Sequence, residues 1–374
     1  MNTEYDFQDI FRHFSIEGEL ADCEHYGEGL INETFCMTVR EKRGTVRYIL
    51  QKINNKLFRD VDKLMHNIRL VTEWCRKSVE ARGGDPMREC LNLVLTRDGG
   101  SYYFDGSHYF RVYVFIENAV AYQSIRDPRD FYECAVAFGD FSNLLSGFDA
   151  SQLYEVLPDF HNTKVRYQNF LRAVEQDVCG RRKEVQREID WAVAHSDLCG
   201  KIVDKIATGE IPLRVTHNDT KINNVMIDKA TGKAVAVIDL DTVMPGSLCY
   251  DFGDSIRFGA SSAAEDEPDI SKVFFRYELY EAYLRGYLSA VGNTITPQER
   301  RALPYGAILM TYECGIRFLT DYLEGDVYFR TRRAKQNIDR THTQFKLVDD
   351  MLGCLDKMEE AAITMTGGNV CKKD

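Results

Sequence analysis

The hydrophobic pattern of the chain changes character along its length. From about residue 20 to residue 116, β-branched and aromatic residues alternate in part with polar ones, and Gly, Asn and Asp separate the runs. This pattern predicts strands at 33–41, 45–53, 91–96 and 108–116. One segment in this part, 60–77, has its apolar residues at helical spacing and predicts a helix.

After residue 128, apolar positions recur with the period of amphipathic helices. The predicted helices lie near 129–146, 164–178, 183–207, 268–290, 297–320 and 331–360. Thr296, Pro297 and Glu299 are typical of a helix start, because a Thr cap, a proline in the first turn and a Glu reaching back to the cap occur together there. Short apolar pieces interrupt the helices and predict strands at 212–217, 224–228 and 234–240.

The order of these elements predicts an α+β protein of two lobes. We expect a small antiparallel sheet lobe over residues 1–117, followed by a larger, mainly helical lobe over residues 118–374. This is the order of a two-lobed, protein-kinase-like fold, whereas a doubly wound sheet would alternate strand and helix. The first lobe would bind a nucleotide, and the second would carry the catalytic and substrate-binding groups.

Composition and charge narrow the classes of function. The chain has 374 residues, of which 44% are hydrophobic and 28% charged, as in a packed globular protein. Lys and Arg number 47 against 58 Asp and Glu, so the net charge of −11 makes nucleic acid an unexpected partner. No signal peptide pattern and no apolar run of the ~18 residues needed to span a bilayer is visible. We therefore expect a cytoplasmic protein that binds no membrane, with its 11 cysteines reduced.

The segment 216–241 contains the pattern that points to chemistry. His217, Asp219 and Asn224 stand at the spacing H-x-D-x-x-x-x-N of the kinase catalytic loop. In that loop the Asp accepts the proton of the attacking hydroxyl and the Asn oxygen binds magnesium, and a second carboxylate, here Asp239, follows the next strand. The pattern predicts Asp219 as the catalytic base, Asn224 and Asp239 as ligands of Mg²⁺, and ATP as the co-substrate.

Residues around this loop are expected to support it. Lys221 is placed to neutralise the transferring phosphate. We expect His217 to hold the loop backbone through hydrogen bonds, and Asp251 and Asp254 in the run YDFGD to accept hydrogen bonds from backbone N–H groups of the loop. The environment of Asp241 is left open between solvent and metal.

Candidate nucleotide contacts come from the first predicted lobe. A glycine turn would bring backbone close to the phosphates, although a GxG motif alone is weak, and the residues after the last strand would offer backbone groups to the adenine. The predicted nucleotide-binding residues are Gly27, Gly29, Phe115, Ile116 and Glu117. The cation that pairs with the phosphates is left open between Gln51 and Lys52, since strand parity alone does not decide between them.

Several longer runs resemble those of the N-acetylhexosamine 1-kinases, a branch of the aminoglycoside phosphotransferase superfamily. They are HNDTKINNVMID, VIDLDTVMPG, YDFGDSIRFGA and ECGIRFLTDYLEGDVYF, and the blocks YGEGLINETF, YILQKIN and LPDFHNTKVRY are similar too, so the likeness covers most of the chain. The resemblance implies an aminoglycoside-phosphotransferase-like fold and magnesium-dependent transfer of a phosphoryl group from ATP. The implied acceptor is the anomeric hydroxyl of N-acetylglucosamine or N-acetylgalactosamine.

The resemblance also implies roles for single residues. Asp219 falls at the position of the base, and Asn224 and Asp239 at those of the magnesium ligands. The residues implied to bind the amino sugar are Asp219, Phe258, Arg317 and Tyr328. Leu30 departs from the family pattern, which tends to have a histidine there, and leaves the preferred hexosamine open.

Structural alternatives exist for the implied sugar contacts. Arg317 and Asp321 are four apart on a predicted helix, so an ion pair within the helix is the alternative to sugar binding. Tyr328 is equally suited to closing a loop, and Phe258 is nearly as well suited to a hydrophobic core.

Other functions remain as alternatives at this point. A kinase of the same architecture acting on choline, homoserine or an aminoglycoside would need carboxylates or an aromatic cage for a cationic substrate, and Arg317 argues against that. A catalytically silent nucleotide-binding module is disfavoured because Asp219, Asn224 and Asp239 are all present. A hydrolase metal site at His217 and Asp219 would need further histidines nearby, and the others are scattered.

Overall fold

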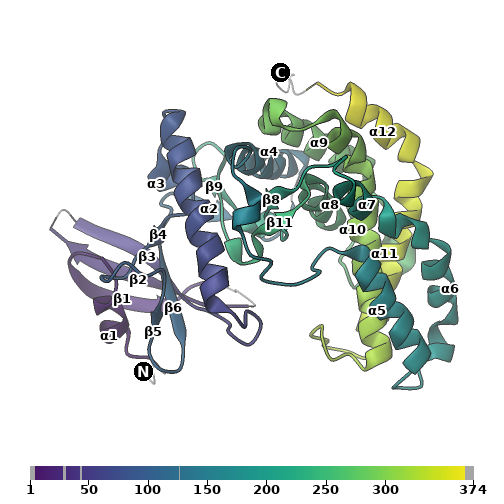
Figure 1. Cartoon of the computed structure of the whole chain (residues 1–374), viewed down its shortest axis with the longest axis horizontal. Coiled ribbons are helices and arrows are strands. Elements are labelled where there is room, and N and C mark those ends of the chain that lie inside the picture. Colours follow the sequence, from purple (N-terminus) through teal and green to yellow (C-terminus); the bar gives the residue numbers. More distant parts are fainter. Residues whose placement is uncertain (1–4, 28–30, 43, 126, 367–374) are drawn as a thin grey trace. The chain divides into compact units, whose positions relative to one another are not determined.

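The chain divides into two compact units in a computed structural model that describes residues 5–27, 31–42, 44–125 and 127–366 (Figure 1). The N-terminal unit comprises Met1–Val120, Ser151–Leu157 and Met226–Met244. The C-terminal unit comprises Ala121–Ala150, Pro158–Val225 and Pro245–Asp374. The segment 226–244, expected in the second lobe, therefore packs in the N-terminal unit, and the expected lobe boundary after residue 117 stays a prediction.

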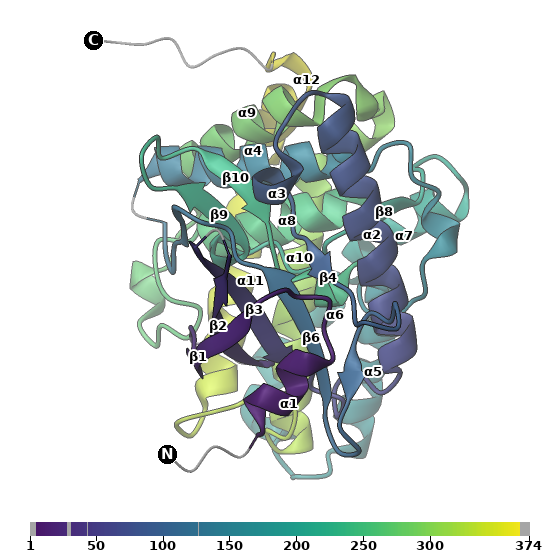
Figure 2. The same cartoon turned by 90° about the vertical axis from the view of Figure 1, so that its left-hand side faces the viewer.

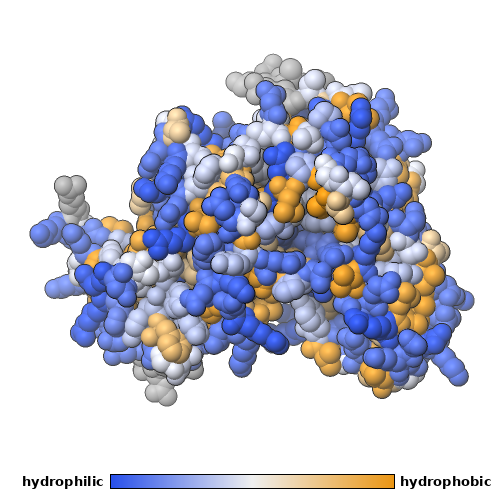
Figure 3. Space-filling model, in the orientation of Figure 1, coloured by the Kyte–Doolittle hydropathy of each residue, from blue (hydrophilic) through white to orange (hydrophobic). Residues whose placement is uncertain are grey.

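The surface is polar where the view of Figure 3 shows it. Hydrophilic side chains dominate this face, and hydrophobic ones are scattered among them. Within the described parts of the chain, no helix combines the length and the apolar character needed to cross a membrane.

The N-terminal unit is built on an antiparallel sheet of six strands, in the order β1-β2-β3-β6-β4 (Figure 2). Strand β5 pairs with β6 beside this path. Its elements are α1 (Phe7–Arg12), β1 (Glu19–His25), β2 (Glu33–Glu41), β3 (Gly44–Lys52), α2 (Val61–Ala81), α3 (Pro86–Glu89), β4 (Leu93–Val94), β5 (Tyr103–Phe104) and β6 (Tyr109–Val114). The predicted strands and the helix are confirmed, although the piece at 91–96 forms a strand only over β4, with a single further bridge between Thr96 and Phe14. β1 was not predicted because most of its residues are exposed and polar, so it lacks an alternating pattern.

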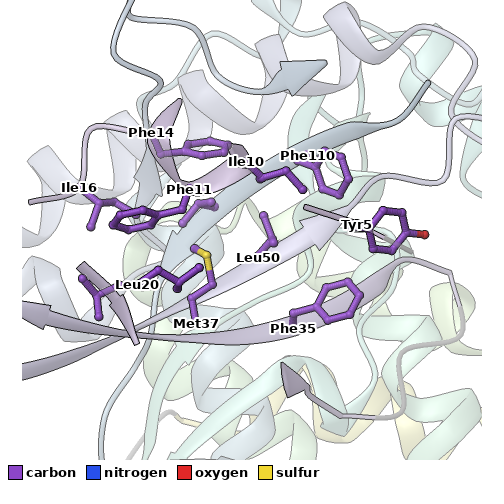
Figure 4. Close-up of a cluster of buried hydrophobic side chains, with 12 residues drawn as sticks. Tyr5, Ile10, Phe11, Phe14, Ile16, Leu20, Phe35, Met37, Leu50 and Phe110 are labelled. Carbon is purple, nitrogen blue, oxygen red and sulfur yellow. The ribbon is translucent and has the colours of Figure 1, made fainter. Parts of the chain in front are cut away.

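One face of this sheet forms the hydrophobic core of the N-terminal unit (Figure 4). In β2 the side chains of Phe35, Met37 and Val39 are buried, as the two-residue period of a strand requires. Leu50 of β3 lies in the same core, and Phe11 of α1 packs against it. The alternation visible in the sequence thus fixes which face of the sheet is covered.

A second sheet explains why the segment 226–244 belongs to the N-terminal unit. Its three strands are ordered β10-β9-β7, where β7 is Ala119–Ala121, β9 is Val225–Asp228 and β10 is Ala234–Val237. Ile116, Ala119 and Ala236 form a small buried cluster there. Strand pairing with a remote segment, which no local pattern encodes, assigns β9 and β10 to this unit.

The C-terminal unit is mainly helical. Its elements are α4 (Pro128–Leu144), α5 (Thr163–Gln176), α6 (Gln186–Ala194), α7 (Val203–Ala207), β8 (Arg214–Thr216), β11 (Met244–Gly246), α8 (Leu248–Gly259), α9 (Tyr277–Val291), α10 (Pro297–Glu324), α11 (Gln336–Gly353) and α12 (Leu355–Thr364). The capping box predicted at the start of α10 is confirmed, with the side chains of Thr296 and Glu299 each accepting from the other residue's backbone. With a small antiparallel sheet lobe and a large helical one, the α+β fold class is confirmed.

Helix α8 was not among the predicted helices. Every residue of α8 except Phe258 is buried, so the helix shows no amphipathic stripe. Two glycines allow it to pack closely against α10: a Cβ at Gly253 would lie 2.2 Å from the carbonyl oxygen of Gly306. A Cβ at Gly306 would likewise lie 2.2 Å from the carbonyl oxygen of Cys249. The position of α8 therefore depends on the absence of side chains at this contact.

We predict that Gly253→Ala lowers the free energy of unfolding by about 1 to 3 kcal/mol, because the added methyl meets backbone and the two helices must separate. Urea unfolding of the full chain measures this change. The matched control is Gly353→Ala in α11, where a Cβ meets nothing within 4 Å, so stability should stay the same or rise slightly. Equal behaviour of the two variants would contradict the close packing of α8 and α10.

Candidate functional site

The loop that follows β8 is held by carboxylates of α8. Asp251 accepts hydrogen bonds from the backbone N–H of His217 at 2.8 Å and of Asn218 at 2.7 Å. Asp254, one turn later on the same helix, accepts from the backbone N–H of Thr220 at 3.1 Å. The predicted role of both aspartates is confirmed. Since both carboxylates are buried, they fix the loop backbone in a water-poor environment where hydrogen bonds to charged groups are strong.

The two carboxylates differ in their electrostatic surroundings. Burial raises the pKa of Asp251, although the neighbouring His217 opposes this. Burial also acts to raise the pKa of Asp254, but Arg257 and Lys221 outweigh it and the pKa is lowered. Arg257 lies 2.9 Å from Asp254. Asp254 is therefore the carboxylate whose ionised form the site favours.

Hydroxyl groups complete the support of the loop. The hydroxyl of Thr220 donates to the carbonyl oxygen of Asp251 at 2.6 Å, and the carbonyl oxygen of Thr220 accepts from Ser255 at 2.8 Å. The hydroxyl of Tyr283 in α9 donates in turn to Ser255 at 2.6 Å. Both polar backbone groups of Thr220 are thus satisfied by α8, which keeps the residue beside it, Asp219, in a defined position.

His217 has the structural role expected of it. Its side chain is fully buried, and its ring lies edge-on to Phe138 and Phe141 of α4. The backbone N–H of Asp219 donates to Nδ1 of His217 at 3.3 Å, so this nitrogen acts as an acceptor. Asn218 between them adopts φ +64°, a left-handed conformation that Asn tolerates better than most residues. The histidine thus holds the turn that presents Asp219.

Asp219, Lys221 and Asn224 form the polar centre of the loop. Oδ1 of Asp219 lies 2.6 Å from Nζ of Lys221, and Asp219 is only partly buried. Nδ2 of Asn224 donates to the carbonyl oxygen of Asp219 at 2.8 Å and to Oδ2 of Asp219 at 3.3 Å. Burial acts to lower the pKa of Lys221, but Asp219 and Asp254 outweigh it and the pKa is raised, so the ammonium stays charged.

Asp239 and Asp241 lie in the N-terminal unit, just after β10. Asp239 adopts φ +61°, a conformation that costs an L-residue roughly 1 to 2 kcal/mol unless its surroundings impose it. Asp241 is buried, with Oδ1 lying 2.5 Å from Arg111 and Oδ2 accepting from Asn32 at 2.6 Å. The sequence left open whether Asp241 faces solvent or a metal ion. Because the side chain is buried, the solvent alternative is wrong.

The predicted nucleotide contacts have the following surroundings. Gly27 adopts φ +77°, which favours glycine, whereas Gly29 and Leu30 lie outside the described residues. After β6, the N–H of Phe115 donates to the carbonyl oxygen of Arg47 at 3.2 Å, and the carbonyl oxygen of Glu117 accepts from Arg88 at 2.5 Å. The adenine-binding role of Phe115, Ile116 and Glu117 stays a prediction, with these two backbone groups already engaged.

Gln51 and Lys52 point to different partners, as neighbours on a strand must. Oε1 of Gln51 accepts from Nε and NH2 of Arg111 at 3.0 and 2.9 Å. Nζ of Lys52 donates to the hydroxyl of Tyr5 at 2.7 Å and to Glu33 at 2.6 Å. The ammonium group of Lys52 is therefore already paired, and Gln51 is an uncharged amide bound to Arg111, so neither side chain offers an unpaired positive charge to a phosphate.

A pocket of about 550 Å³ opens beside the loop within the C-terminal unit. Phe258 lines it together with residues that directly follow Asp219, and its side chain is 38% exposed. The lining residues are Gln123, Ser124, Ile125, Phe131, Thr220, Lys221, Ile222, Asn223, Ser255, Phe258, Gly259, Ser261, Ser262, Ala263, Ala264, Arg276 and Leu279. Hydroxyls, amides and two cations are present, and none of these described residues is acidic.

Arg317 and Tyr328 are close to each other but do not line this pocket. The guanidinium of Arg317 lies 5.7 Å from the ring centre of Tyr328 and 5.4 Å from that of Phe329. Asp321 instead accepts from the backbone N–H groups of 327, 328 and 329. The alternative of an Arg317–Asp321 ion pair is therefore wrong, because Asp321 closes the loop after α10.

Two residues of these networks, Arg111 and Asn32, were not singled out from the sequence. A signal for Arg111 was present, since it is the one charged residue in the apolar run HYFRVYVFI, and a lone charge in a buried strand needs partners. Asn32 offered no such signal, because it stands in a stretch that mixes polar and apolar residues.

The donor set fits magnesium rather than a softer metal. Asn224 donates both of its assigned hydrogen bonds through Nδ2, so its amide oxygen is turned away from Asp219, and Asp239 offers a carboxylate. Across the residues that the structure describes, no group of three or more His, Cys, Asp or Glu side chains is gathered for a metal ion. Asn224 in the C-terminal unit and Asp239 in the N-terminal unit thus each offer an oxygen of the kind that magnesium prefers, and their assignment as its ligands stays a prediction.

Comparison with known protein families finds a match over most of the chain. The family model described as "Phosphotransferase enzyme family" matches residues 23–303.

Solved structures similar to this chain share its fold at low sequence identity. An aminoglycoside phosphotransferase from Alicyclobacillus acidocaldarius has 13% identity and a TM-score of 0.59, with 98% of each chain covered. A microcompartment-associated aminopropanol kinase has 14% identity and a TM-score of 0.56, covering 94% of this chain and 97% of that one. A choline kinase from Cryptosporidium parvum has 13% identity and a TM-score of 0.51, covering 92% and 91%. At such identities the likeness concerns the fold alone.

We predict that Asp254→Asn lowers the free energy of unfolding at neutral pH by about 3 kcal/mol, because it leaves the buried Arg257 with one carboxylate fewer. The stabilisation by Asp254 is present above its ordinary pKa and is lost as the pH falls through its lowered pKa. The variant should therefore lose less stability than the wild type between neutral and acidic pH.

Urea unfolding of both proteins at several pH values measures this difference. Asp190→Asn, on the exposed side of α6, is the matched control and should change stability by less than about 0.5 kcal/mol. A parallel decline of wild type and Asp254→Asn with acid would contradict the lowered pKa of Asp254.

Proposed function

Because the chain belongs to the phosphotransferase enzyme family, we propose that it transfers the terminal phosphoryl group of ATP to the anomeric hydroxyl of an N-acetylhexosamine. The product is the sugar 1-phosphate, and the acceptors are N-acetylglucosamine and N-acetylgalactosamine. The observation that carries the phosphotransferase part is the loop in which Asp219 is held between Lys221 and Asn224.

The proposed reaction is a direct in-line transfer. Asp219 accepts the proton of the anomeric hydroxyl as its oxygen forms a bond to the terminal phosphorus, while the bond from that phosphorus to the ADP oxygen breaks. Lys221 places a positive charge next to the reacting groups and stabilises negative charge on the phosphoryl oxygens. Magnesium, held by Asn224 and Asp239 when it is bound, would supply further positive charge there. Positioning therefore accounts for most of the rate.

The chemistry of the pocket supports a neutral, hydroxyl-rich acceptor. A cationic acceptor would need carboxylates or an aromatic cage, and the described residues around the pocket include no acid, while Lys221 and Arg276 add positive charge. Serine, threonine and amide side chains match sugar hydroxyls, and the exposed ring of Phe258 suits an apolar sugar face or acetamido methyl. The runs similar to the N-acetylhexosamine 1-kinases support the amino sugar in particular. The same resemblance supports Arg317 and Tyr328 as further sugar contacts, although neither residue lines this pocket.

Asp219→Asn is predicted to lower turnover by at least about 100-fold, because an amide cannot accept the proton. Binding of ADP, measured by isothermal titration calorimetry, should remain close to that of the wild type. The control Asp197→Asn replaces an exposed carboxylate of the same unit and should leave both quantities unchanged. Substantial residual turnover in Asp219→Asn would reject Asp219 as the base.

A panel of acceptors, scored by ADP release, tests the proposed substrate. N-acetylglucosamine and N-acetylgalactosamine should support turnover, and choline, ethanolamine and kanamycin should not. The methyl glycoside of N-acetylglucosamine is the matched control, since it keeps every group except the free anomeric hydroxyl and should be inactive. Turnover with the amino alcohols but with neither sugar would overturn the acceptor assignment and leave the family assignment intact.

A further inference from the structure

Arg111 is a fully buried cation within the N-terminal unit. It lies in β6 directly opposite Gln51 of β3, and its side chain is 1% exposed. A buried guanidinium needs hydrogen-bond and charge partners on every side, because burial removes it from water. We therefore infer the role of Arg111 from the residues that it contacts.

The partners of Arg111 lie on two sides of the guanidinium. Oε1 of Gln51 receives two hydrogen bonds, from Nε at 3.0 Å and from NH2 at 2.9 Å. On the other side, NH1 lies 2.5 Å from Oδ1 of Asp241. The charges of Asp241 and Asp239 act together to raise the pKa of Arg111 against the effect of burial, so both carboxylates lie within its electrostatic reach.

Asp241 extends the network to Asn32, just before β2, and through it to Asn54, just after β3. Its second oxygen accepts from Nδ2 of Asn32 at 2.6 Å, and Oδ1 of Asn32 accepts from the backbone N–H of Asn54 at 2.9 Å. One carboxylate oxygen of Asp241 thus forms an ion pair with Arg111, and the other accepts a hydrogen bond from Asn32. The carboxylate of Asp241 is therefore held from two directions, by Arg111 and by Asn32, and it anchors the segment 239–241.

Arg111 and Lys52 are cations of neighbouring strands that contact different residues. Kinases keep a lysine on the third strand that pairs with the phosphates and with a helix glutamate. In β3 of this protein, Lys52 is bound to Tyr5 and Glu33, whereas Gln51 on the opposite side of the strand receives Arg111. The cation that pairs with Asp241 therefore comes from the neighbouring strand β6.

We propose that Arg111 is a positioning residue that holds Asp241, and with it the turn carrying Asp239, in the arrangement that Asp239 needs to bind a divalent cation. The inference rests on the proposed function, which assigns Asp239 to magnesium. Arg111 is buried and contacts Gln51, Asp241 and the ring of Tyr113, so we assign it a role that acts through Asp241. The turn needs such a support, because Asp239 has the left-handed backbone conformation φ +61°.

The test removes both charges of the buried pair at once. In the double variant Arg111→Met/Asp241→Asn no unpaired charge stays buried, so we expect it to fold with a melting temperature close to that of the wild type. Calorimetric titration with ADP, in excess magnesium and in EDTA, measures how much magnesium strengthens binding. Affinity in EDTA should be retained, and affinity in magnesium should fall roughly 10- to 100-fold, as for other residues that support a metal ligand.

Arg111→Lys provides a second variant that keeps the charge. Lysine can reach Asp241 or Gln51 but cannot serve both with a planar fork, so its affinity for ADP in magnesium should fall less than in the double variant. If the double variant does not fold, Arg111→Lys decides the matter by the same titration, and wild-type affinity in magnesium would then overturn the proposal.

A matched control separates positioning from general loss of stability. Arg214 and Glu299 form another ion pair, in the C-terminal unit, with both nitrogen–oxygen distances at 2.9 Å; Glu299 is buried and Arg214 is partly buried. The double variant Arg214→Met/Glu299→Gln should leave the gain in ADP affinity from magnesium unchanged. An equal loss in both double variants, or wild-type affinity in magnesium for a folded Arg111→Met/Asp241→Asn, would overturn the proposal.

Failure of the acceptor assignment leads to a different result. If no sugar is phosphorylated but magnesium strengthens ADP binding in the wild type and not in the double variant, the acceptor is wrong and the role of Arg111 holds. If magnesium does not strengthen ADP binding in the wild type, Asp239 is not a magnesium ligand and the proposal for Arg111 is rejected with it.

Discussion

Hydrogen bonds from loop backbone to two buried carboxylates are the constraint on which the candidate site depends. Asp251 and Asp254 lie on one face of α8 and accept three N–H groups of the segment 217–220. An irregular loop has no ladder of its own to satisfy these donors, and buried donors without partners are costly. Carboxylates on a helix satisfy these donors, because hydrogen bonds to charged acceptors are strong and the helix fixes the spacing of the acceptors. The glycine contact that brings α8 against α10 therefore serves the loop as well as the fold.

The N-terminal unit uses the same physical device with the opposite sign. There a buried cation, Arg111, donates hydrogen bonds to Gln51 and forms an ion pair with Asp241, and Asp241 in turn accepts a hydrogen bond from Asn32. In both units a charge removed from water is neutralised by several directional partners, and the polar turn beside it is fixed as a result. The residue proposed as the base, Asp219, and the residue proposed as a magnesium ligand, Asp239, each lie next to such a network.

Family and fold set the reaction type, whereas the acceptor depends on the site. Structures named as aminoglycoside, aminopropanol and choline kinases share this fold at 13 to 14% identity, so the fold alone does not select among acceptors. The lining of the pocket next to Lys221 is more informative, because the charges of the lining side chains affect which acceptors can be desolvated there. The proposal of a neutral polyol rather than a cationic amine as the acceptor rests on the hydroxyls, amides and cations of this lining.

The sequence by itself determined what local patterns encode. The alternation in 33–41 and 45–53 gave the central strands, Thr296 with Glu299 gave a helix start, and the spacing of the catalytic loop gave its candidate residues. Only the tertiary structure decided that β9 and β10 pack in the N-terminal unit, that Gln51 receives Arg111, and that Asp321 binds loop backbone instead of Arg317. The physical reason is that periods and caps are set by neighbours a few residues apart, whereas the partner of a buried charge or of a strand edge is chosen among segments that meet only when the chain is folded.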